Sequence, residues 1–215
     1  MSLKSIKSLV SAQEKKLGVT EGSTSIIAVS KLQPNERIEI VLKSGHRIFG
    51  ENRVQEANTK WPKFKEKFKN IELHLLGPLQ RNKVRDAVEL FDFIHTIDNI
   101  KLAQRISLMK EKTGRCPKLF IQVNTGKETQ KAGVDVDNLE KLLTTCSELR
   151  LPVVGLMCIP PISEDPYPHF EVLRTLNEKY NLSELSMGMS NDFEKAILAG
   201  ASYIRVGSAI FGQRP

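Results

Sequence analysis

Short apolar runs alternate with longer amphipathic stretches along the whole chain. Apolar runs of this length are typical of buried strands, and we predict strands at Ser25–Ser30, Arg47–Phe49, Glu72–Leu76, Phe93–Ile97, Lys118–Asn124, Val153–Ile159, Glu184–Met187 and Tyr203–Val206. The stretches between them have helical patterns, and we predict helices at Pro34–Ser44, Arg53–Phe68, Gln80–Leu90, Asn99–Lys112, Asp137–Leu149, His169–Tyr180 and Asp192–Ala199. A short apolar tail, Ser208–Phe211, follows the last strand.

This alternation predicts a parallel sheet, because parallel strands need a crossover connection that a helix usually supplies. The run Val153–Met157 has no polar side chain, which suits a strand buried on both faces. Eight such units are the number that closes a barrel. We therefore predict an α/β fold, a single-domain (β/α)8 TIM-type barrel over residues 1–215. An open doubly wound sheet is the alternative, but the first strand ends in Ala28-Val29-Ser30-Lys31 rather than in its glycine-rich turn.

The start of the chain predicts an extra N-terminal helix. Leu3, Ile6, Val10 and Leu17 fall near helical spacing, and Glu14 stands among lysines. The segment lacks the apolar core and small-residue cleavage site of a secretory signal. We interpret it as a surface helix packed on the domain, with a mitochondrial transit peptide as the alternative.

The net charge of +7 predicts an anionic partner. The densest basic run, residues 60–69, places Trp61, Phe64 and Phe68 on one helical face. We assign that face to the core and the lysines to the solvent side, so we expect no nucleic-acid partner. A phosphorylated small molecule satisfies the same charge. RNA binding by this run is the alternative.

The cysteines and histidines are few and scattered. The three cysteines form no metal or redox pattern, and the four histidines form no zinc motif, so we expect no metal site. Unpaired cysteines suit a reducing compartment. No apolar run approaches the roughly 20 residues that span a bilayer. We expect a cytoplasmic protein without a membrane partner.

Lys31 is the residue most clearly placed for chemistry. Functional groups of α/β barrels lie at the C-terminal ends of the strands, and Lys31 directly follows the first apolar strand. Partial burial there would lower the pKa of the amine and make it a nucleophile toward an aldehyde. The alternative is a lysine whose amine reaches out to water.

The ends of the last two strands are suited to phosphate. Ser190 precedes an acidic helical segment, Gly207 permits close backbone approach, and Ser208 offers a hydroxyl and an N–H. Taken singly, Ser190 could be a helix N-cap and Gly207 a turn glycine. Together with Lys31 they imply an aldehyde cofactor with a phosphate arm, pyridoxal 5′-phosphate (PLP), held as a Schiff base on Lys31.

Two residues are assigned to the cofactor ring. Arg205 lies on the last strand and can face the pyridine nitrogen, where a permanent cation would leave that nitrogen unprotonated and weaken the ring as an electron sink. Asn52 follows the second strand and can bond the ring's 3-oxygen, or instead cap the next helix.

Five segments resemble the PLP homeostasis protein family: Ala28–Lys31, Phe49–Glu56, His74–Lys83, Gly188–Glu194 and Ile204–Gly212. The family resembles in turn the N-terminal barrel domain of alanine racemase, and the resemblance runs from near residue 5 to the end. It implies PLP on Lys31, phosphate near Ser190, Gly207 and Ser208, and Arg205 at the ring nitrogen. Members are thought to buffer and deliver PLP, and so to serve vitamin B6 homeostasis rather than catalysis.

Three residues are secondary candidates. Lys131, in the loop 125–133, resembles a family lysine proposed to help PLP leave. His74 and Met157 stand near the ends of the third and sixth strands, and His74 could act as an acid or base. Ser208 stands where the family more usually has threonine, which keeps the hydroxyl.

Two functions compete: a non-catalytic PLP carrier and a small PLP-dependent amino-acid racemase with Lys31 as one base. Racemisation needs a second acid–base group on the opposite face, which alanine racemase supplies as a tyrosine with the help of a second domain. This sequence stops at Pro215, just after the last strand, and its tyrosines at 167, 180 and 203 are expected elsewhere. We favour the carrier, expected to be monomeric, with apo PLP-dependent enzymes as candidate recipients.

Overall fold

Strands and helices alternate through the computed structural model, which describes residues 2–128 and 130–213. The strands are β1 (Ser25–Val29), β2 (Ile48–Glu51), β3 (Glu72–Leu75), β4 (Phe93–Ile97), β5 (Lys118–Asn124), β6 (Val134–Asp135), β7 (Val153–Met157), β8 (Glu184–Met189) and β9 (Tyr203–Val206). The helices are α1 (Leu3–Leu17), α2 (Asn35–Lys43), α3 (Val54–Lys67), α4 (Val84–Leu90), α5 (Ile100–Thr113), α6 (Val136–Glu148), α7 (Pro166–Lys179), α8 (Phe193–Leu198) and α9 (Ser208–Phe211), with a 3₁₀ turn at Arg81–Lys83.

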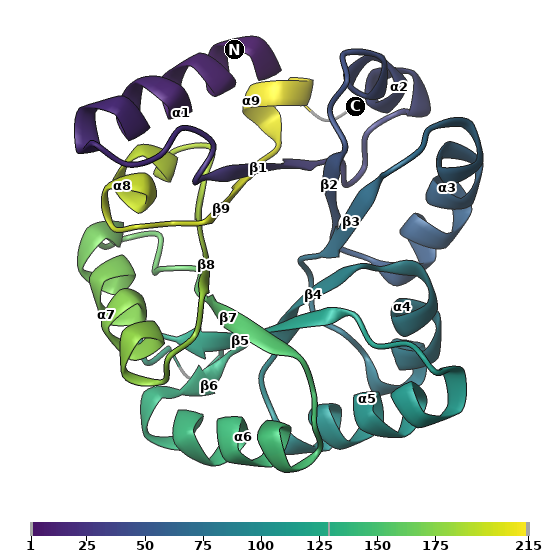
Figure 1. Cartoon of the computed structure of the whole chain (residues 1–215), viewed down its shortest axis with the longest axis vertical. Helices are drawn as coiled ribbons and strands as arrows, with labels where there is room; N and C mark the ends of the chain where they lie inside the picture. The colour runs from purple at the N-terminus through teal and green to yellow at the C-terminus, as the bar shows by residue number, and fades with distance from the viewer. Residues whose placement is uncertain (1, 129, 214–215) are drawn as a thin grey trace.

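The strands close into a parallel barrel. The order around the ring is β1-β2-β3-β4-β5-β7-β8-β9, and β9 pairs back onto β1. The helices form an outer ring (Figure 1). The predicted TIM-type barrel is therefore confirmed, and the open sheet is excluded because a closed ring has no edge strand. Within the described ranges, no helix is both long enough and apolar enough to cross a membrane.

The boundaries differ from the prediction where local hydrogen bonds decide them. Helix α7 begins at Pro166, three residues before the predicted start, because the Asp165 carboxylate accepts a hydrogen bond from Tyr167 N (3.1 Å). Strand β6 was not predicted. It is two residues long and pairs only with β5, so it leaves no periodicity in the sequence.

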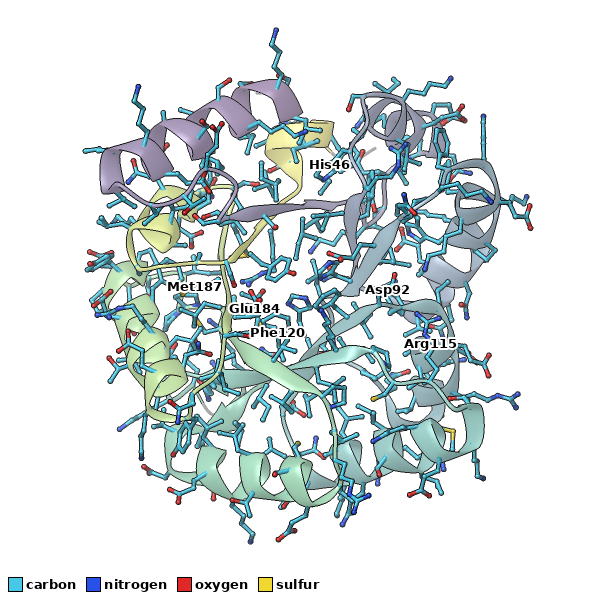
Figure 2. The ribbon with its side chains drawn as sticks, viewed as in Figure 1. His46, Asp92, Arg115, Phe120, Glu184 and Met187 are labelled. Atoms are coloured by element: carbon cyan, nitrogen blue, oxygen red, sulfur yellow. The ribbon has the colours of Figure 1, made fainter. Side chains whose placement is uncertain are left out.

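Two different layers surround the strands. Outside them, against the helices, lies an apolar layer with the large buried side chains of Phe49, Trp61, Phe91 and Phe170. Burial of Trp61 and Phe64 confirms that this part of the apolar face of the basic helix belongs to the core, whereas Phe68 is the extended C-cap residue of α3 and is only partly buried. Inside the ring, side chains from non-adjacent strands meet, so the barrel is filled rather than open (Figure 2).

Helix α1 is present as predicted and packs beside α8 and α9 (Figure 1). Ile6 and Val10 are buried, as their spacing suggested. Glu14 is not a surface charge among lysines, since only 1% of it is exposed. Its carboxylate accepts hydrogen bonds from Gly22 N (2.9 Å) and Thr24 N (2.7 Å), which anchors the loop that leads into β1.

Candidate functional site

A pocket of about 490 Å³ lies at the C-terminal mouth of the barrel. Its lining comes from the ends of six different strands and the segments that follow them: Val29, Lys31, Asn52, Leu76, Ile159, Pro160, Pro161, Ile162, Glu164, Pro166, Met189, Ser190, Asn191, Asp192, Lys195, Arg205, Gly207 and Ser208. This volume suits a small-molecule site. A depression of about 620 Å³ near Arg81 and Lys101 is larger, but its lining comes only from the segments after β3 and β4.

The mouth pocket contains all six residues predicted to hold a cofactor: Lys31, Asn52, Ser190, Arg205, Gly207 and Ser208. They come from the ends of β1, β2, β8 and β9, which the barrel closure brings together. Among the described residues, no group of three or more His, Cys, Asp or Glu side chains is arranged to hold a metal ion.

Carboxylates hold the residues on both sides of Lys31. Before it, the Ser30 hydroxyl donates to Glu51 Oε1 (2.7 Å). After it, Leu32 N donates to Glu56 Oε1 (2.6 Å), and Leu32 adopts a φ of 57°, which non-glycine residues rarely take. These contacts tie the lysine-bearing turn to β2 and α3, so its chain direction is set by the rigid scaffold.

Glu51 is the deepest of these anchors. It is fully buried, and besides Ser30 it accepts a hydrogen bond from Trp61 Nε1 (3.1 Å). Desolvation by burial raises the pKa of this carboxyl group, against the opposing effect of the Lys60 charge. Lys60 Nζ also donates to Ser30 O (3.3 Å). The sequence analysis did not single out Glu51 or Lys60.

The phosphate candidates gather at one point. Gly207 N donates to Ser190 Oγ (3.4 Å), and the hydroxyls of Ser190 and Ser208 are 3.5 Å apart. Helix α8 starts at Phe193, so Ser190 is not its N-cap residue. Gly207 has a φ of −114°, so no turn requires glycine there. A Cβ at this position would instead lie 3.3 Å from Val29 O, which makes it a site of close backbone approach.

Helix α9 begins at Ser208, and no side chain of the described residues caps it. The first N–H groups of a helix have no partner within the helix. Ser208 N and Ala209 N therefore stand beside the two serine hydroxyls as further donors suited to an anion.

Arg205 is buried, with 5% of its surface exposed. Its Nη1 donates to Ser186 Oγ (2.9 Å) and its Nη2 to Cys158 O (2.9 Å). Burial lowers the pKa of the guanidinium, yet an arginine keeps its proton across the physiological range. Burial also raises the pKa of the Cys158 thiol to about 12, so this neighbour remains neutral.

Asn52 lies in the segment between β2 and α3. The N-cap residue of α3 is Arg53, which makes no side-chain cap bond, so the helix-cap alternative for Asn52 is excluded. A Cβ on Gly77 would lie 2.1 Å from Asn52 O. Glycine at position 77 is therefore required for the segment that carries Asn52 to pack as it does.

The three secondary candidates lie outside the pocket lining. His74 and Met157 are fully buried in the barrel interior. Lys131 Nζ pairs with Glu128 Oε2 (2.5 Å) and donates to the carbonyl of the lining residue Pro160 (3.4 Å).

Sequence reasoning missed the apolar side of the pocket. Ile159, Pro160, Pro161 and Ile162 follow β7, and Met189 ends β8. Ile162 is 98% exposed in the structure. The hydrophobic pattern could not reveal this, because an isoleucine is equally typical of a buried strand. The Pro160-Pro161 pair was the available signal for a rigid segment at this strand end.

Comparisons with known proteins show the family of the chain. Residues 5–215 match the family described as "Alanine racemase, N-terminal domain". The chain is 37% identical over 225 residues to the pyridoxal phosphate homeostasis protein of Escherichia coli (strain K12), covering 99% of this chain and 95% of that protein. It is 39% identical over 207 residues to the protein of that name from Aquifex aeolicus (strain VF5), covering 92% and 90%.

Solved structures show the same likeness. PipY of Synechococcus elongatus PCC7942, in a structure described as having PLP bound, is 39% identical with a TM-score of 0.82, covering 94% of this chain and 100% of that one. The alanine racemase of Streptomyces coelicolor A3(2) is 16% identical with a TM-score of 0.74, covering 100% of this chain and 60% of that one, which shows a shared fold alone. The chain thus belongs to the pyridoxal phosphate homeostasis protein family, within the wider family of alanine racemase N-terminal domains.

Proposed function

We propose that the mouth pocket binds PLP and that the protein takes part in cellular PLP homeostasis. The observation that carries this proposal is the convergence of the Lys31 amine, the Ser190 and Ser208 hydroxyls and the buried Arg205 guanidinium on a single pocket of about 490 Å³. The names of the relatives from Escherichia coli and Aquifex aeolicus, and the PLP described in the PipY structure, support it.

The residues present fit the cofactor group by group. PLP supplies a reactive aldehyde, an aromatic ring and a phosphate dianion. The Lys31 amine can form a carbon–nitrogen double bond with the aldehyde carbon, and one water molecule leaves. Ser190, Ser208 and the N–H groups at the start of α9 offer the donors that a phosphate accepts. The carboxylate-anchored turn fixes the residues on both sides of Lys31, whose amine would reach the cofactor from the same pocket.

Arg205 would limit the electron withdrawal by the ring of a bound cofactor. A guanidinium facing the pyridine nitrogen donates a hydrogen bond and supplies no proton, so the ring withdraws electrons weakly. Replacing Arg205 with alanine should therefore change the absorption spectrum and leave phosphate binding mostly intact. Asn52 stands where its amide can contact the ring's 3-oxygen.

A carrier is favoured over a racemase by the absence of a tyrosine from the described pocket lining. Tyr203 starts β9, at the opposite end of the strand from the mouth, and its ring lies 5.4 Å from that of His74 in the barrel interior. Burial raises its pKa, which keeps the hydroxyl protonated. The tyrosine expected as the second acid–base group of a racemase therefore has no counterpart in the described pocket lining, which favours the carrier.

The test is the spectrum and mass of the purified protein. The PLP-loaded protein should show a visible band, and borohydride should fix the cofactor mass on the peptide containing Lys31. Lys31→Ala should fold normally by circular dichroism and lose both signals. Lys195→Ala is the matched control, because Lys195 lines the same pocket but pairs with Asp165 (2.8 Å), and it should keep them. Retention of both signals in Lys31→Ala would remove Lys31 from its role.

Enzyme and carrier are separated by turnover. The PLP-loaded protein should not interconvert L- and D-alanine or other amino acids at ordinary enzymatic rates, and steady-state racemisation would overturn the carrier assignment. We further infer a cytoplasmic monomer that supplies apo PLP-dependent enzymes. The three cysteines, all unpaired, support a reducing compartment. Sedimentation and transfer to an apo-enzyme are the corresponding measurements.

A further inference from the structure

A chain of hydrogen bonds crosses the interior of the barrel from one end to the other. It starts at Glu72, the first residue of β3, whose side chain is 36% exposed. Glu72 Oε1 is 2.9 Å from His74 Nε2, and His74 Nδ1 is 2.8 Å from His95 Nε2. His95 Nδ1 is 2.8 Å from Ser186 Oγ, which accepts from Arg205 Nη1 (2.9 Å) at the cofactor pocket.

With both imidazoles neutral, the chemistry of the two ends fixes every proton in between. A carboxylate only accepts, so His74 must donate from Nε2. In the neutral imidazole the other nitrogen then accepts, which requires His95 to donate from its own Nε2. His95 Nδ1 is left as an acceptor for the Ser186 hydroxyl. That hydroxyl accepts in turn from Arg205, which can only donate.

The surroundings keep both imidazoles neutral and in place. His74 stacks on Phe93 with ring centroids 4.4 Å apart, and His95 stacks on Phe120 at 4.2 Å. Burial lowers the pKa of both histidines, because the charged form would lose its hydration. Figure 2 shows Phe120 near the barrel axis. Because both imidazoles are neutral, every hydrogen bond in the series has its donor on the pocket side and its acceptor on the Glu72 side.

This alignment of hydrogen bonds explains how the buried Arg205 cation is stabilised at the pocket. The acceptors of the Arg205 guanidinium in the described chain are the neutral Ser186 hydroxyl and the Cys158 carbonyl. A buried charge is costly unless hydrogen bonds and an opposite charge compensate it. The aligned dipoles of the chain turn their negative ends toward Arg205, and Glu72 supplies the negative charge at the far end. Asp192 adds a carboxylate on the pocket side.

We propose that Glu72, His74, His95 and Ser186 are positioning residues that orient the Arg205 guanidinium and transmit the charge of Glu72, on the far face of the barrel, to the cofactor pocket. This inference rests on the proposed PLP function where it concerns the bound cofactor. Its first step, the order of donors and acceptors, belongs to the protein alone and is tested without PLP.

Other ionisable groups surround Glu72 and must be separated from it. The depression at its end of the barrel, about 410 Å³ in volume, is also lined by Asp92, Arg115 and Lys118. Tyr203 and Glu184 are the titratable groups on the neighbouring part of the ring. Glu184 begins β8 near the barrel axis and takes no part in the hydrogen bonds from Glu72 to Arg205, so it offers a matched control (Figure 2).

The first experiment is nitrogen NMR of the histidine side chains in the cofactor-free protein. Both His74 and His95 should be neutral and carry the proton on Nε2 at pH 7. A cationic ring, or a proton on Nδ1 of either residue, would contradict the proposed order of donors and acceptors, whether or not the protein binds PLP.

The second experiment compares variants by the pH midpoint of the visible band in the PLP-loaded protein. Glu72→Gln keeps an acceptor for His74 but removes the charge, so the midpoint should fall by roughly half a pH unit, the size of a remote charge effect at an effective dielectric near 20. Ser186→Ala interrupts the series of hydrogen bonds beside Arg205 and should lower the pH midpoint at least as much. Glu184→Gln should leave it unchanged.

An equal response of Glu72→Gln and Glu184→Gln would overturn the proposal that the chain transmits charge. A wild-type protein without any visible band would instead overturn the proposed function. The NMR result would still test the order of donors and acceptors between Arg205 and Glu72.

Discussion

The two faces of β3 show how the barrel divides its work between neighbouring residues. Leu73 and Leu75 point outward into the apolar layer under the helices, and both are fully buried. His74, between them, points inward and joins a hydrogen-bonded chain that ends at the pocket. The same strand therefore contributes to stability on one face and to the electrostatics of the site on the other. Changes on the outer face should alter stability without altering the site.

Leu73→Ala gives the largest expected effect on this division. Removing a fully buried leucine side chain should lower the free energy of unfolding by about 2–5 kcal/mol, because apolar burial is lost and a cavity remains. Urea unfolding measures the loss. The PLP-loaded variant, studied below its unfolding transition, should keep the visible band of the wild type. A changed band would show that the outer layer also shapes the pocket.

The sequence alone predicted the barrel and the polar residues at its mouth, because both follow from local patterns. Strand and helix alternation fixes the crossover topology, and residues that follow strands in a barrel converge on one end. Lys31 and Ser190 are 159 positions apart, yet this rule was enough to bring them to one pocket.

The barrel interior could not be predicted in the same way. His74 and His95 are separated by 21 positions and His95 and Ser186 by 91, and their contact depends on strand register across the ring. Each of them alone resembles a scattered polar residue. Glu14 was missed for a related reason, since its role depends on a loop that folds back toward it.

Acidification should destabilise both layers, because buried histidines lie in each. Burial lowers the pKa of His46, outside the barrel strands, to about 4, and it lowers the pKa of His74 and His95 inside. The folded state keeps these rings neutral, while the unfolded chain takes up protons below about pH 6.5. Stability is therefore full above that pH and falls as the pH drops toward the folded pKa values.

Urea unfolding at pH 7.5 and 5.0 measures this loss, and His46 alone should contribute roughly 2 kcal/mol. His46→Gln should remove the outer share of the pH dependence and leave the share of His74 and His95. A variant that titrates like the wild type would show that the interior histidines dominate acid sensitivity. Stability that does not change over this range would contradict the neutral, buried state of all three rings.

The smallest expected effect lies on the outer ring, at the start of α5. The Asn99 side chain accepts a hydrogen bond from Leu102 N (2.9 Å) and so satisfies one of the free N–H groups of the helix. Asn99→Ala should cost about 1 kcal/mol of unfolding free energy, and Asn99→Ser should restore most of it, because serine caps helices comparably well. Both variants should bind PLP as the wild type does. If Asn99→Ala weakened PLP binding while Asn99→Ser did not, a helix cap outside the pocket lining would control the site, and the division between the outer layer and the interior would fail.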